Sequence, residues 1–315
     1  MSAGWAGGAV RAVGLVRRRA GRAGARRVAA AGSVAGALAA LRGGPYGHAA
    51  AAATVAEAQR LVAGTVLWHL RVLAGWLPRD GVRTLRTLAA AFELANIAEH
   101  LRALTTDAPA AYFRMGALAT AWPRLAETRT PDRLRAALAV SPWADPGDRP
   151  DIVRTLRYRY VAWLASVPAP APAWAAAATA LLVAGDRFAG GRVPPRRTVT
   201  ALLGPAANDA ASLPDLAAAL PRAARWALAD VATPDDLWRA EGRWWTRLDH
   251  DGRALLATAG LGPNAALGAA ALLAADAWRV RAALTAASGG PTALTTYDLL
   301  VNDAPTTTRG APDAA

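Results

Sequence analysis

Cysteine and lysine are both absent from this 315-residue sequence. Without cysteine the chain forms no disulfide, holds no metal through thiolates and has no cysteine nucleophile. Since lysine is absent, the 36 Lys and Arg residues of the sequence are all arginine. So uniform a usage weakens any inference from a single arginine to a specific recognition role.

Residues that favour sheets, and long apolar runs, are also scarce. Isoleucine occurs only at Ile97 and Ile152, and there are 3 Phe, whereas Ala and Leu dominate a composition that is 54% hydrophobic. This balance favours helices, so we predict an all-α fold with a sizeable core. The most apolar stretch, residues 174–185, is too short to cross a bilayer. We therefore expect a protein that is soluble or peripheral to a membrane.

Motifs that carry chemistry are largely missing. The sequence has no phosphate-binding loop, no dinucleotide fingerprint and no nucleophile elbow, and its four histidines lie far apart. The sequence "DHDG" at residues 249–252 lacks the further ligands of a calcium loop, and we interpret it as a polar turn. We predict no catalytic residue, no metal site and no cofactor.

Positive charge is concentrated at the N-terminus. Residues 1–53 contain eight arginines and no acidic residue, out of a net charge of +13. Such a segment suits an acidic protein partner, nucleic acid or anionic lipid, or it reflects a general preference for arginine. Arg26-Arg27 and the apolar residues after them resemble a twin-arginine export signal, but this stretch has counterparts later in the chain.

Three stretches share a pattern that predicts a helix followed by a turn. They are "SVAGALAALRGGPYG" from Ser33, "TPDRLRAALAVSPWA" from Thr130 and "SLPDLAAALPRAARW" from Ser212. Each begins with a residue suited to cap a helix. In the first two, a Pro–aromatic pair follows the helix, and these repeat-corner candidates are Pro45, Tyr46, Pro142 and Trp143.

Aromatic and arginine-bearing helices, and then apolar helices, are predicted after each stretch. Asn96 and Asp276 interrupt the apolar faces of the first and third apolar helices. A buried polar group needs a partner, so we expect each to bind a neighbouring helix end or an arginine, or alternatively a partner protein.

The sequence therefore predicts an all-helical scaffold of three quasi-repeated units. The expected boundaries are a flexible N-terminus (1–10), unit 1 (11–110), unit 2 (111–197), unit 3 (198–287) and a disordered tail (288–315).

Residues 11–290 resemble one family, the central-stalk socket proteins of the V/A-type rotary ATPases, which prokaryotic and eukaryotic enzymes share. The resemblance lies in the arginine-rich "VRRRAGRAGARR" from Val16, in Gly44-Pro45-Tyr46-Gly47 and in Phe92–Ile97 followed by Arg102. The middle and last units have Gly185-Asp186 and Ala275-Asp276 in place of Asn96-Ile97. We add Arg102, Asp276 and Arg279 to the candidate partner-contact residues.

The resemblance implies that the three units form a funnel-like scaffold, and that the protein is a non-catalytic adaptor of an ATP-coupled proton or sodium pump. Such an adaptor would lie at the cytoplasmic face of the membrane, held there by the rotor ring and the central stalk, and would bind no small-molecule substrate. Three alternatives stay open: a helical interaction scaffold outside any ATPase, a basic nucleic-acid-binding protein and an enzyme without a known motif.

Overall fold

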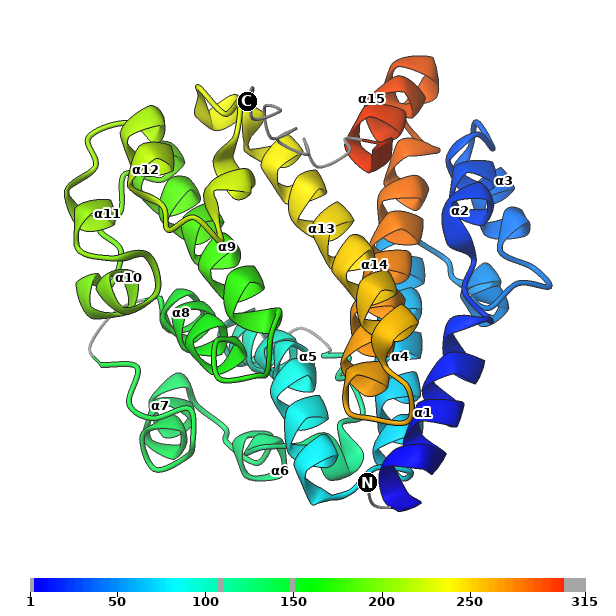
Figure 1. Cartoon of the computed structure of the whole chain (residues 1–315), viewed down its shortest axis with the longest axis horizontal. Coiled ribbons are helices and arrows are strands. Elements are labelled where there is room, and N and C mark those ends of the chain that lie inside the picture. Colours follow the sequence, from blue (N-terminus) through cyan, green and yellow to red (C-terminus); the bar gives the residue numbers. More distant parts are fainter. Residues whose placement is uncertain (1–2, 107–109, 148–150, 303–315) are drawn as a thin grey trace, which may run out of the picture.

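The computed structural model describes residues 3–106, 110–147 and 151–302, and over these ranges it contains helices and turns but no strand (Figure 1). The predicted all-α class is therefore confirmed. Within the same residues, no helix combines the length and the apolarity that crossing a bilayer requires.

Six long helices make up the centre of the molecule, and consecutive ones form pairs joined by short turns (Figure 1). The pairs are α4 (Val55–Ala74) with α5 (Arg79–Thr106), α8 (Ile152–Leu164) with α9 (Ala171–Ala184), and α13 (Leu237–Thr258) with α14 (Asn264–Ala286). A single π-helical turn, η3 (Gly185–Ala189), extends α9.

Shorter helices pack beside the second helix of each pair. Beside α5 lie η2 (Gly116–Leu118), α6 (Trp122–Leu125) and α7 (Pro131–Ala139). Beside α9 lie α10 (Arg196–Leu203), α12 (Leu213–Ala219) and η4 (Arg225–Leu228). The short α11 (Ala206–Asp209) packs on α10 and α12, and η5 (Pro234–Asp236) leads into α13.

The group beside α14 comes from the opposite end of the chain. It consists of α1 (Ala3–Val16), α2 (Gly21–Ala29) and α3 (Val34–Ala40), with η1 (Gly47–Ala51) following (Figure 1). The C-terminal helix α15 (Gly290–Asn302) packs on α13 and α14. Helices from the two ends of the described chain, α1–α3 and α15, thus pack on the same long helix, α14. This packing joins the two ends of the fold.

The three predicted helix starts are confirmed. The side-chain oxygens of Ser33, Thr130 and Ser212 each accept a hydrogen bond from a backbone N–H three residues later, at 3.0, 3.2 and 3.2 Å. These bonds satisfy N–H groups that the first turn of a helix leaves unpaired. The quasi-repeat of three similar units stays a prediction.

Three local expectations are corrected. The N-terminus is helical from Ala3, because Ala9 and Ala12 are buried on one side of α1, and residues 290–302 are helical, because Tyr297 and Val301 are buried. Residues 303–315 lie outside the described ranges. The "DHDG" stretch is not a turn: it lies inside α13, where arginines one turn away pair with its carboxylates.

Candidate functional site

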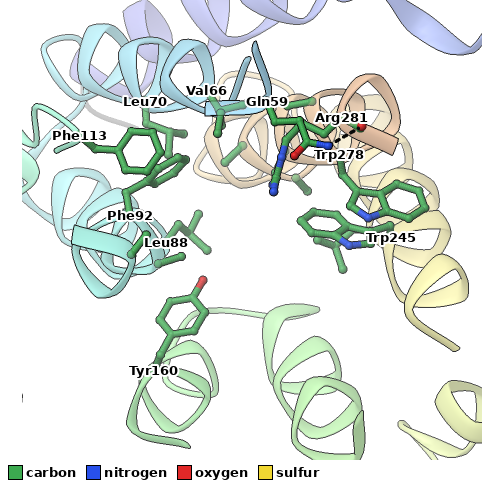
Figure 2. A pocket seen from close by; sticks show the side chains of 18 of the residues that line it. Gln59, Val66, Leu70, Leu88, Phe92, Phe113, Tyr160, Trp245, Trp278 and Arg281 are labelled. Carbon is green, nitrogen blue, oxygen red and sulfur yellow. Dashed lines mark hydrogen bonds between the residues drawn. The ribbon is translucent and has the colours of Figure 1, made fainter. Parts of the chain in front are cut away.

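A cavity of about 490 Å³ lies between the six long helices, and all six contribute to its wall (Figure 2). This volume falls within the range typical of ligand pockets. Seven aromatic side chains line the wall together with alanine and leucine: those of Phe92, Phe113, Tyr160, Trp174, Trp244, Trp245 and Trp278.

The rings contact one another and are therefore fixed in orientation. Phe92 and Phe113 pack edge to face, with centroids 5.2 Å apart, and Trp245 stacks on Trp278 at 5.6 Å. The indole N–H of Trp244 donates to the carbonyl oxygen of Trp174 at 3.0 Å. Aromatic pairs of this kind add stabilisation beyond the area that they bury, so the wall is preformed.

A few polar side chains interrupt the apolar lining. Gln59, Arg60 and Arg281 lie on the α4 and α14 side, and Tyr160 comes from α8 (Figure 2). Burial raises the pKa of Tyr160 to about 12, so its phenol is neutral at physiological pH. The cavity can thus offer apolar contact, ring stacking, hydrogen bonds and positive charge.

The structure brings Tyr46 and Asp276 together. Both are buried, and the Tyr46 hydroxyl donates to Asp276 Oδ2 at 2.9 Å. Asp276 also accepts from the backbone N–H groups of Ala20 (3.0 Å) and Gly21 (2.8 Å) at the start of α2. Its partner is therefore a neighbouring helix end, one of the two kinds expected from the sequence.

Asn96 does not line the cavity but binds the backbone of Phe113, a residue that does. Its amide donates to the carbonyl oxygen of Phe113 at 2.9 Å and accepts from the N–H of the same residue at 2.6 Å. Asn96 is fully buried, whereas the ring of Phe113 lines the cavity. We conclude that Asn96 holds in place a segment that would otherwise have no regular hydrogen bonds.

Trp143 fills the turn after α7. It is fully buried, packs on Trp163 with ring centroids 4.3 Å apart and donates its indole N–H to Glu93 at 2.7 Å. Glu93 also accepts from the backbone N–H groups of Thr120 and Ala121. Trp143 therefore attaches this turn to α5.

Arg279 belongs to a buried charge cluster. Its guanidinium lies 3.1 Å from Asp249, and Arg253 and Arg19 lie at 2.9 and 3.8 Å from the same carboxylate. Burial alone raises the pKa of Asp249, but the hydrogen bond from Arg253 and the charge of Arg279 outweigh it and leave the pKa below its ordinary value.

The other predicted residues do not join a common site. Arg102 is exposed and pairs with Glu99 on the same helix at 2.7 Å, Pro45 is half-buried, and Pro142 is exposed. The eight predicted residues thus divide among α5, α14 and the turns after α3 and α7. Their role in binding a partner stays a prediction.

Several cavity residues were not predicted as a site. Trp244 and Trp245 stand out in the sequence "RWWTR", but the sequence alone favours a core-facing stripe there. Arg60, Phe113 and Arg281 belong to no motif that marks a binding site. Only the packing of six helices from distant parts of the chain brings them together.

Within the described residues, no group of three His, Asp or Glu side chains is placed to hold a metal ion. The central cavity is the candidate functional site, because it has the volume of a ligand pocket and combines aromatic rings with polar and charged side chains. Comparison with known proteins adds no family: no protein-family model matches the chain, and no curated protein is significantly similar to it in sequence.

Proposed function

We propose that this protein is the non-catalytic socket of a V/A-type rotary ATPase, which links the rotating central stalk to the membrane rotor ring during proton or sodium transport. The observation that supports the proposal best is the central aromatic cavity between the six long helices, which would receive the end of the shaft. The motifs Gly44-Pro45-Tyr46-Gly47 and Phe92–Ile97 provide the resemblance to that family.

A socket must transmit torque without deforming. Close-packed helices resist compression and shear, and this chain packs α1, α2 and α3 against α14, so that its two ends support each other. The buried ion pair between Arg279 and Asp249 adds directional contacts inside the same region. None of these features requires a bound cofactor.

The proposal also implies where the protein lies in the cell and which proteins it contacts. The protein would lie at the cytoplasmic face of the membrane and would be held there by the proteins of the rotor ring and the shaft. Part of its positive charge already has internal partners, since Arg26 pairs with Asp298 at 2.9 Å. This pairing reduces the charge that a nucleic acid could contact.

Two measurements test the proposal. ATPase genes should neighbour this gene, and the tagged protein should co-purify with the shaft and rotor-ring proteins. Filling the cavity by Ala95→Trp or Ala274→Trp should abolish recovery of the shaft proteins, whereas Val140→Trp, at a site 87% exposed on the surface, should not. The proposal is contradicted if a cavity-filling variant still recovers the shaft proteins. It is also contradicted if neither the unchanged protein nor any variant recovers an ATPase component.

The same cavity also suits a helical interaction scaffold outside any ATPase. This second candidate predicts that the cavity-filling variants lose a different set of proteins, none of them an ATPase component. The co-purification experiment therefore separates the two candidates.

A further inference from the structure

Positive charge lines one wall of the cavity. Arg60 of α4 and Arg281 of α14 are among its lining residues, and none of the side chains that line it is a carboxylate. The remaining wall is mainly alanine, leucine and aromatic rings. The apolar surroundings strengthen the electrostatic interactions of these two guanidinium groups.

Neither guanidinium has a carboxylate within 4.0 Å among the described residues, in contrast to Arg154 and Arg253, which pair at 2.7 and 2.9 Å. Arg60 instead lies over the ring of Phe113, 4.4 Å from its centroid. Arg60 also lies close enough to Glu99 to help lower the pKa of that carboxyl. The charge of Arg60 is thus held at the cavity without a direct counter-ion.

Arg281 is in a similar position. Arg281 lines the cavity but is exposed to solvent; partial burial lowers its pKa, while the more distant Glu241 raises it. Glu241 itself accepts a hydrogen bond from the indole N–H of Trp278 at 3.3 Å. An anion in the cavity would find two guanidinium groups without a carboxylate partner and could pair with both of them.

Gln59 joins the two helices that carry these arginines. Its amide nitrogen donates to the carbonyl oxygen of Arg281 at 3.0 Å (Figure 2). The same nitrogen donates to the hydroxyl of Thr285 at 2.8 Å. These bonds tie α4 to α14 next to Arg60. They therefore fix the backbone of Arg281 relative to α4.

We propose that the cavity recognises an apolar helix end that carries a carboxylate, with Arg60 and Arg281 binding the carboxylate and the aromatic rings packing on the apolar side chains. Guanidinium groups bind carboxylates through charge-assisted hydrogen bonds, often two at once. The inference rests on the proposed function for the identity of the partner, which is the shaft. It adds the chemistry by which the shaft end is recognised.

Three ten-carbon probes test this chemistry without any partner. Decanoate, decanol and decylammonium share an alkyl chain and differ in charge, and binding changes the fluorescence of the four tryptophans that line the cavity. We expect decanoate to bind about tenfold more tightly than decanol, and decylammonium to bind most weakly. Equal binding of decanoate and decanol, tighter binding of decylammonium, or no binding of decanoate overturns the proposal.

Substitutions locate the selectivity. In the double variant Arg60→Gln/Arg281→Gln, the affinity for decanoate should fall to about the affinity for decanol. Arg281→Lys should keep part of the difference between the two affinities. Arg83→Gln, on an exposed arginine that pairs with Asp80, is the matched control and should change nothing. Far-ultraviolet circular dichroism checks that each variant is folded. Selectivity that survives the double substitution overturns the proposal.

Two further results separate this inference from the proposed function. If decanoate selectivity is present but no shaft protein is recovered with the chain, the proposed function fails and the carboxylate site stands. If the shaft is recovered equally well with the double arginine variant, the proposed function stands and the carboxylate site fails. A small carboxylate found in the purified protein by native mass spectrometry would overturn the assignment to a helix end.

Discussion

Asp276 connects parts of the chain that lie between 230 and 256 positions apart. We predict that Asp276→Ala lowers the free energy of unfolding by about 3 kcal/mol, because it leaves the N–H groups of Ala20 and Gly21 and the hydroxyl of Tyr46 without their acceptor. Urea denaturation measures the change. Asp132→Ala, in the exposed first turn of α7, should cost less than about 1 kcal/mol, and equal losses would contradict this role.

His69 makes the stability depend on pH. Burial, with help from the charges of Arg11 and Arg18, lowers its pKa from 6.5 to about 4. Between pH 6.5 and pH 4, His69 is therefore protonated in the unfolded chain but mostly neutral in the folded chain. As a result, the free energy of unfolding is highest above pH 6.5 and decreases as the pH falls toward 4. We expect a loss of about 1–3 kcal/mol over this window.

The test of the His69 prediction compares thermal unfolding at about pH 7 and about pH 4.5. His69→Leu should lose less stability between the two pH values than the unchanged protein does, because the neutral side chain does not titrate. His250→Leu, at an exposed position of α13, should keep the pH dependence of the unchanged protein. A pH dependence that is the same with and without His69 would refute the prediction.

Single polar residues were partly predictable from the sequence. An asparagine or aspartate on an apolar helix face needs a partner, and Asn96 and Asp276 both have one. The identity of each partner was not predictable, because Phe113 and Gly21 offer only backbone groups, which have no signature in the sequence.

The pair α13 and α14 illustrates how glycine sets the distance between two helices. A methyl group added at Gly268 would lie 2.8 Å from the carbonyl oxygen of Gly252 and 3.0 Å from Leu255, closer than real contacts allow. We predict that Gly268→Ala lowers the free energy of unfolding by about 1–2 kcal/mol, even though alanine favours the helix.

The matched control is Gly64→Ala in α4. The nearest atoms to the added methyl group would be those of the Phe113 ring, 3.9 Å away, which is an ordinary contact. This variant should therefore gain up to about 1 kcal/mol from helix propensity. Chemical denaturation of both proteins measures the difference, and a stabilising Gly268→Ala would show that the two helices separate without cost.

Whole elements were predicted best where the first turn carries a local signal. Ser33, Thr130 and Ser212 marked three helix starts correctly, because a cap acts within a single turn of the helix. The helix over residues 249–252 was missed because a closely spaced pair of aspartates is also typical of a polar turn. The arginine partners of Asp249 and Asp251, one turn away in the sequence, were the available clue.

The whole molecule could be predicted only as far as its all-α class. The cavity depends on how α4, α5, α8, α9, α13 and α14 pack, and residues that meet there lie far apart in the sequence, as Gln59 and Arg281 do at a separation of 222 positions. A sequence pattern predicts contacts within one helix or between two consecutive helices. It carries no direct information on which helices enclose a hollow.

The N-terminal helices are part of the fold, and this gives a prediction for a truncated chain. Deleting residues 1–32 removes α1 and α2, together with the buried Ala12, Leu15 and Val28, and uncovers α14. Because domains are stable by only roughly 5–15 kcal/mol, we expect the truncated protein to aggregate or to lose its cooperative thermal transition. Size-exclusion chromatography and circular dichroism measure both effects.

The charge of this segment is tested separately from its packing. Arg22 and Arg27 are exposed, so the double variant Arg22→Gln/Arg27→Gln should keep the cooperative transition while it lowers the net charge by two. Any loss of nucleic-acid or lipid binding in this variant then reports on charge, whereas a loss on truncation reports first on folding. A truncated protein that stays monomeric and melts like the full chain would show that the N-terminal helices are an appendage, and the two ends of the fold would then be independent of each other.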